Sequence, residues 1–171
     1  MKVSTLSILL CSAVALFFVY TTTTGVAHVG HAEETAPTAA ADAPTHGEWW
    51  VDFEQAQAAA RAQNKPMLLD FTGSDWCGWC IKLDKEVFSQ PEFKAYAAES
   101  LVLVELDFPK RKPQSAAIQA QNEALAEKYG IRGFPTILLL TPEGELIERT
   151  GYMRGGAATY VAHLKAILAD V

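Results

Sequence analysis

The chain has 171 residues, of which 50% are hydrophobic, and its formal net charge at pH 7 is −6. This length suits one ordinary domain with an extension, and it allows a core to form without a metal or disulfide to hold it. The acidic balance argues against a nucleic-acid partner.

The N-terminus has the layout of a secretory signal. Lys2 supplies a positive charge, an apolar run extends from Leu6 to Tyr20, and small residues follow. We expect residues 1–27 to be a signal peptide cleaved after "GVA", with cleavage after "GHA", near residue 32, as the alternative. The run is shorter than the roughly 20 apolar residues that a membrane span needs, so an uncleaved anchor is the less favoured interpretation.

The segment that follows, residues 28–46, is predicted to be a flexible linker. It is rich in Ala, Thr and Pro and has almost nothing large to bury. Residues 47–171 are then the single folded domain. Removal of the signal also removes Cys11 and leaves only Cys77 and Cys80. A disulfide that closes so short a loop would stabilise a fold little, even in an oxidising compartment.

Helices and strands are expected to alternate at the start of the folded part. A capping box at Asp52 and Gln55 predicts a first helix, which ends before Pro66. The short apolar runs 67–71 and 101–107 predict buried strands.

Further helices and a hairpin follow from the same kinds of pattern. Four more helices are predicted. The first covers 77–88, the second is a short helix that starts at a capping box formed by Ser89 and Glu92, the third covers 115–129, and the last runs from 157 onward. Pro135 opens the strand "TILLL", and the turn "TPEG" joins it to "ELIERTG". This order predicts an α/β domain with a central mixed sheet and helices on both faces.

Helix geometry gives Cys77 and Cys80 different positions. Three residues along a helix place their Cα atoms roughly 5 Å apart, inside the range for a disulfide. Cys77 meets the free N–H groups at the helix start, which favour its thiolate, whereas Cys80 lies one turn deeper. We therefore predict that Cys77 is the attacking nucleophile and that Cys80 resolves the mixed disulfide.

The residues around the two cysteines are candidates for substrate binding. Gly78 lets a partner chain approach closely. Trp76 and Trp79 offer flat apolar surface for a peptide-like substrate, with simple core packing as the alternative for each.

Two motifs resemble those of the thioredoxin superfamily. "LLDF" followed by "WCGWC" is similar to its strand and active site, and "YGIRGFPTILLL" is similar to its later Gly-x-Pro-Thr segment. The resemblance extends over about Trp49 to Val171 and looks closest to exported, single-domain thioredoxin-like proteins of bacteria. It implies a three-layer sandwich and a location in the bacterial periplasm or outside the cell.

The resemblance also implies roles for individual residues. Pro135 would follow a cis peptide bond from Phe134, and both would help to position the substrate opposite the cysteines. Asp70 would be the buried carboxylate that accepts the proton of Cys80. The connection "TGSDW" is one residue longer than is usual in the family, which makes Asp75 an alternative acceptor.

We therefore expect a thiol-disulfide oxidoreductase that acts on exported protein thiols or disulfides and is reset by an unidentified redox partner. No cofactor is expected besides the redox-active disulfide, and contact with a membrane is expected only if the signal stays uncleaved. The Gly-Trp dipeptide between the cysteines leaves the direction open between reduction, isomerisation and oxidation.

Two other functions remain as alternatives. One is copper or zinc handling, although two thiolates fill only half of a tetrahedral zinc site and His163 is the only histidine of the folded part. We assign no metal ligand. The other is a non-catalytic binding module on the same fold. The basic loop 109–113 is interpreted as a solvated loop, with partner docking as its alternative.

Overall fold

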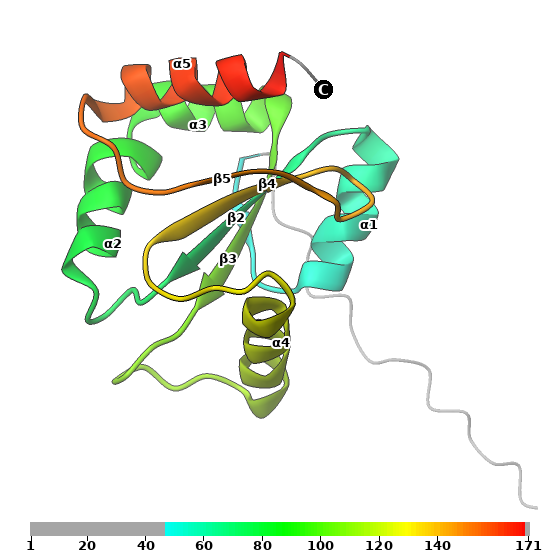
Figure 1. Ribbon diagram of the computed structural model, residues 1–171, viewed down its shortest axis with the longest axis vertical. Coiled ribbons are helices and arrows are strands. Elements are labelled where there is room, and N and C mark those ends of the chain that lie inside the picture. The colour runs from blue at the N-terminus through cyan, green and yellow to red at the C-terminus, as the bar shows by residue number, and fades with distance from the viewer. Residues whose placement is uncertain (1–46, 170–171) are drawn as a thin grey trace, which may run out of the picture. The chain divides into compact units, whose positions relative to one another are not determined.

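The structure is a computed structural model that describes residues 47–169. The predicted signal peptide and linker lie outside the described residues, as does Val171, which was expected on the last helix. Five strands form one mixed sheet in the order β1-β3-β2-β4-β5 (Figure 1). The strands are β1 Trp49–Trp50, β2 Met67–Thr72, β3 Val102–Asp107, β4 Thr136–Leu140 and β5 Leu146–Thr150.

The central strand of this sheet is β2, and it is buried along its whole length. It runs parallel to β3 and antiparallel to β4, β1 is parallel to β3, and β5 is antiparallel to β4. The sheet is therefore mixed, as predicted. The sequence did not predict β1, because two residues are too few to show an alternating pattern.

The helices cover both faces of the sheet. They are α1 Phe53–Gln63, α2 Gly78–Leu83, α3 Pro91–Ser100, α4 Ala116–Lys128 and α5 Gly156–Leu168, with a π-helical turn η1 over Asp84–Phe88. In Figure 1, α3 and α5 lie side by side, whereas α1 and α4 belong to the other layer. The predicted thioredoxin-like three-layer sandwich is confirmed.

Side chains of the strands alternate between these two layers. One face of the sheet carries Leu68 of β2, Leu103 of β3 and Ile137 of β4, which pack with α2, η1, α3 and α5. We call this face the thiol face. The neighbouring residues Leu69 and Val104 point to the opposite face and pack with α1 and α4. By this alternation Asp70 and Glu105 also lie on the thiol face. Leu68 and Leu103, which precede them on this face of the central strands, are apolar.

The segment after Cys80 differs from the single helix that was predicted over 77–88. It is α-helical only as far as Leu83 and then continues as η1. The capping box at Ser89 and Glu92 was also wrong. Pro91 takes the first position of α3, and Gln90 before it is extended, so that Gln90 is the N-cap. The Ser89 hydroxyl instead donates to the Asp84 carboxylate, at 3.0 Å.

Candidate active site

The two cysteines lie where the central strand β2 leads into α2. A tight turn follows the strand, in which the Cys77 N–H donates to the Gly73 carbonyl at 2.8 Å. Cys77 is the N-cap of α2, and its Sγ accepts the Cys80 N–H at 3.2 Å. The pair forms a disulfide with a Cα–Cα distance of 5.3 Å, close to the predicted spacing. Cys77 is 7% exposed and Cys80 is 4% exposed, so both residues are buried in the disulfide form, Cys80 slightly more than Cys77.

Aromatic side chains lie on both sides of the disulfide. Trp76 is 38% exposed and contacts the Phe134 ring edge-on, at a centroid distance of 5.9 Å. The peptide bond between Phe134 and Pro135 is cis, as the family resemblance implied. Trp79 is 55% exposed, and its ring lies 5.2 Å from that of Tyr152. Tyr152 was not expected beside Trp79, since the two are far apart along the chain.

The residue between Cys77 and Trp79 is open to its surroundings. A Cβ added at Gly78 would meet nothing within 4 Å. Lys82, one turn further along α2, places its Nζ 5.3 Å from the centroids of both the Trp79 and Tyr152 rings. These residues form an apolar surface with a cationic edge next to the disulfide.

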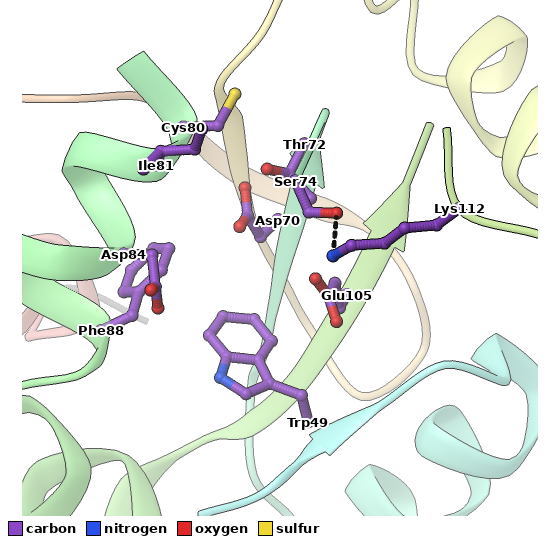
Figure 2. A pocket seen from close by; sticks show the side chains of 10 residues that line it. All are labelled: Trp49, Asp70, Thr72, Ser74, Cys80, Ile81, Asp84, Phe88, Glu105 and Lys112. Atoms are coloured by element: carbon purple, nitrogen blue, oxygen red, sulfur yellow. Dashed lines mark hydrogen bonds between the residues drawn. The ribbon is translucent and has the colours of Figure 1, made fainter. Parts of the chain in front are cut away.

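A cavity of about 350 Å³ lies beneath Cys80 (Figure 2). It is lined by Trp49, Asp70, Thr72, Ser74, Cys80, Ile81, Asp84, Phe88, Glu105 and Lys112. Asp70 is 8% exposed, and its Oδ1 has no hydrogen-bond partner. Burial raises the pKa of Asp70 well above its usual range, and the carboxylates of Glu105, Asp84 and Asp107 raise it further. A neutral Asp70 next to Cys80 is therefore the favoured form at acidic pH.

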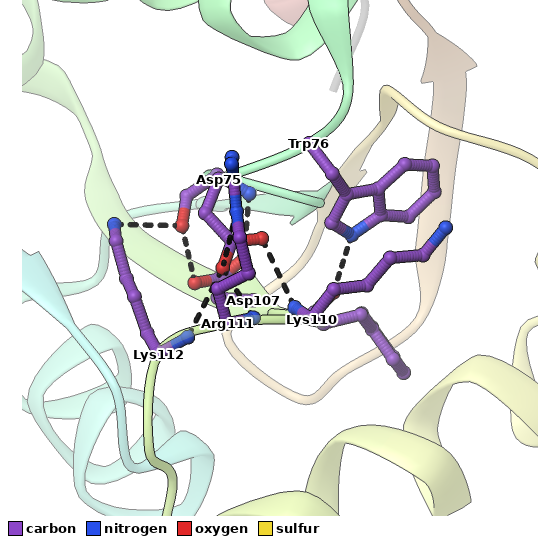
Figure 3. A network of polar contacts seen from close by, with 8 residues as sticks. Asp75, Trp76, Asp107, Lys110, Arg111 and Lys112 are labelled. Carbon is purple, nitrogen blue, oxygen red and sulfur yellow. Dashed lines mark hydrogen bonds and ion pairs between the residues drawn. The ribbon is translucent and has the colours of Figure 1, made fainter.

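Asp75, the alternative acceptor, lies elsewhere. Its carboxylate accepts the backbone N–H groups of Lys110, Arg111 and Lys112 at 3.0, 2.6 and 3.0 Å (Figure 3). These hydrogen bonds, the one from Lys110 first, lower the pKa of Asp75. Asp75 does not line the cavity under Cys80. Its position favours Asp70 as the acceptor.

The basic loop 109–113 is thus attached mainly through its backbone; its charged side chains are exposed, and that of Lys112 also donates to the Ser74 hydroxyl. The connection before Cys77 is fixed to this region by further hydrogen bonds. The Ser74 hydroxyl donates to Asp107 at 2.5 Å, and the Trp76 indole N–H donates to the Phe108 carbonyl at 2.8 Å. The longer connection "TGSDW" therefore anchors the start of α2 without displacing Asp70 from the cavity.

The described residues also bear on two of the alternatives, a metal site and a membrane anchor. Within residues 47–169, no group of three His, Cys, Asp or Glu side chains is placed to hold a metal ion. His163 lies 3.1 Å from the Thr150 hydroxyl. In the same range, no helix has the length and apolar character to cross a membrane.

Comparison with known proteins finds thioredoxin-like and disulfide-exchange proteins. The family model of the thioredoxin-like domain matches residues 53–167. The disulfide bond reductase DsbH of Chlamydia pneumoniae is 36% identical over 136 residues, which cover 80% of this chain and 79% of DsbH. The thiol:disulfide interchange protein DsbD of Klebsiella pneumoniae is 37% identical over 115 residues, which cover 66% of this chain but only 17% of DsbD.

Solved structures show the same similarity. A DsbH oxidoreductase superposes with a TM-score of 0.69 at 35% identity, over 82% of this chain and 94% of that one. A thioredoxin from Thermus thermophilus superposes with a TM-score of 0.54 at 19% identity, over 71% of this chain and 87% of that one, and shares the fold.

Proposed function

The chain belongs to the thioredoxin-like domain family, and from this premise we propose that it works in the reducing direction, on disulfides of exported proteins. The more general activity, thiol-disulfide exchange through Cys77 and Cys80, follows from the family and from the disulfide in the site. The name of the relative DsbH, a disulfide bond reductase, supports the direction.

The observation that carries the proposal is the cluster of carboxyl groups around Cys80. Asp70, Asp84 and Glu105 line the cavity next to this thiol, and Lys112 is its one cationic lining residue among those that the structure describes. Nearby carboxylates disfavour a thiolate. A redox pair whose thiolate is poorly stabilised gives up its electrons more readily, whereas strong oxidants stabilise their reduced form. The free N–H groups at the start of α2 stabilise a thiolate and so oppose this effect, but they act on the Cys77 sulfur only.

The proposed reaction has two exchanges. In the first, the Cys77 thiolate attacks one sulfur of the substrate disulfide, forms a mixed disulfide, and releases the other substrate sulfur as a thiolate that takes up a proton. In the second, Cys80 passes its proton to Asp70 as its sulfur attacks Cys77. The bond from Cys77 to the substrate breaks, and the second substrate thiolate leaves. The substrate gains two electrons and the pair loses them.

We expect the redox potential of the pair to lie near that of thioredoxin, about −270 mV, and far from the value of about −120 mV of a strong oxidant. Equilibration of the purified protein in thiol-disulfide buffers, followed by alkylation of free thiols and mass measurement, gives this potential. A value near the oxidising limit would contradict the reducing direction while leaving thiol-disulfide exchange intact.

The proposal includes export to the bacterial periplasm or the cell exterior. It is supported by the signal-like pattern of residues 1–27, and export would bring the pair to secreted substrates and to a partner protein that returns electrons to it. The mass of the mature protein checks this, because cleavage at the two predicted sites starts the chain at residue 28 or 33. A mature protein that keeps its full N-terminus would contradict cleavage.

A further inference from the structure

Asp70 has a second carboxylate beside it on the neighbouring strand. In the parallel pairing of β2 with β3, Asp70 is opposite Glu105. Paired residues of neighbouring strands point to the same face, so both side chains extend into the layer that holds α2. Both line the cavity beneath Cys80 (Figure 2). Glu105 is only partly buried, whereas Asp70 is buried.

A lysine lies on the outer side of Glu105. The Lys112 side chain reaches over the cavity from the loop after β3, and its Nζ donates to the Ser74 hydroxyl at 2.9 Å (Figure 2). Burial and then the charge of Asp107 raise the pKa of Glu105 above its usual range; the charge of Lys112 lowers it and offsets part of this rise, and Asp84 also raises it. Lys112 thus favours the ionised form of Glu105 against its surroundings.

We propose that Glu105 is a positioning residue for the proton of Asp70: when it is ionised, a form that Lys112 favours, its charge raises the pH at which Asp70 is free to accept the proton of Cys80. This inference rests on the proposed role of Cys80 as the resolving thiol. Three observations carry it, which are the strand register, the shared cavity and the unpartnered Oδ1 of Asp70.

Other groups near Asp70 also carry or acquire charge. From the elements packed around it these are Cys80 of α2, Asp84 of η1, Glu105 and Asp107 of β3, Lys112 of the following loop and Tyr160 of α5. Burial and then the charge of Asp70 raise the pKa of Tyr160, so its phenol stays neutral. After burial, Glu105 is the strongest influence that raises the pKa of Asp70. Asp84 is exposed, so solvent screens its charge more.

The consequence concerns the second exchange only. When Cys80 attacks the Cys77 sulfur of the mixed disulfide, its proton moves to the Asp70 carboxylate and the bond to the departing thiolate breaks. Asp70 is able to take this proton only if it is ionised beforehand. An ionised Glu105 at the paired position disfavours that ionisation and delays the step to higher pH. The first exchange, at Cys77, has no such requirement.

The test is the Glu105→Gln variant of the reduced protein, mixed with an aromatic disulfide that releases a coloured thiolate at each exchange. The fast release reports Cys77 attack, and the slow release reports Cys80 attack. We expect the pH midpoint of the slow release to move to lower pH, so that this phase is about 3- to 10-fold faster than wild type at mildly acidic pH. The fast phase stays unchanged. Glu127→Gln, an exposed carboxylate on α4 with the same charge change, is the matched control.

Three outcomes decide the proposal. An unchanged slow-phase midpoint in Glu105→Gln, or an equal shift in Glu127→Gln, overturns it. A larger shift in Asp84→Asn than in Glu105→Gln overturns it as well, because the exposed carboxylate would then dominate. In support, carboxyl NMR titration should find the Glu105 pKa raised in Lys112→Met but not in Lys94→Met. Absence of any fast release would instead contradict the proposed function, independently of Glu105.

Discussion

Replacing Cys77 by serine is expected to reduce disulfide-exchange activity to background, a loss of at least about 1,000-fold. The serine hydroxyl ionises far less readily than a thiol, and the remaining Cys80 is buried within α2, at 4% exposure. No other cysteine of the folded part is available to replace the attacking sulfur. The measurement is the initial rate of disulfide reduction with a dithiol as electron donor.

Cys80→Ser is the matched control for that variant. It keeps the Cys77 thiol at the N-cap of α2, so that the first exchange proceeds, but nothing resolves the mixed disulfide. Substrates should then stay bound to Cys77 and appear as adducts on a non-reducing gel, whereas Cys77→Ser gives none. Equal trapping by both variants would contradict the separate roles of the two thiols, and trapping by Cys77→Ser alone would reverse them.

The second large effect is expected from Asp70→Asn. The amide does not accept the proton of Cys80, so the second exchange should slow by about 100-fold, the lower end of what a positioned acid or base contributes. The fast attack by Cys77 should change much less. Aromatic-disulfide kinetics separate the two phases, and an equal loss in both would indicate general damage to the site rather than a lost proton acceptor.

The same variant should be more stable than wild type at neutral pH. Because the folded-state pKa of Asp70 is raised, its contribution to stability is complete below the unfolded value of about 3.9 and is lost as the pH rises through the folded value. The amide carries no charge to bury, so we expect a gain of about 1 to 3 kcal/mol in the free energy of unfolding at neutral pH. The gain should vanish in acid. Urea unfolding at several pH values measures it.

Most of the fold was predictable because its patterns are local. The Asp52 side chain accepts the Gln55 N–H at 2.9 Å, as the capping box requires, and Asn64 ends α1 in a left-handed conformation. One exception depends on neighbours in space, and another is local. β1 exists because Trp49 and Trp50 pair with the middle of β3. The residue that caps α3 is decided by Pro91, which holds Gln90 extended.

The candidate site was predictable where a motif marks it. The spacing of the cysteines and the resemblance around Asp70 and Pro135 identified these residues before their positions were known. Glu105 was missed because the strand 101–107 was interpreted only as a buried apolar run. A signal was present, since Asp70 and Glu105 each place a carboxylate at an inward position of a core strand. Their register, which makes them neighbours, is a property of the folded sheet.

The open position at Gly78 has a consequence for how such a protein diversifies. A Cβ added there meets nothing within 4 Å, and the next residue, Trp79, is more than half exposed. The two residues between the cysteines therefore lie outside the constraints of the core. Substitutions in this dipeptide should therefore have little effect on folding, whereas the carboxylates of Asp70 and Glu105 are held at fixed positions by the sheet. Descendants of one scaffold are thus able to acquire new partners at the surface and inherit their proton chemistry unchanged.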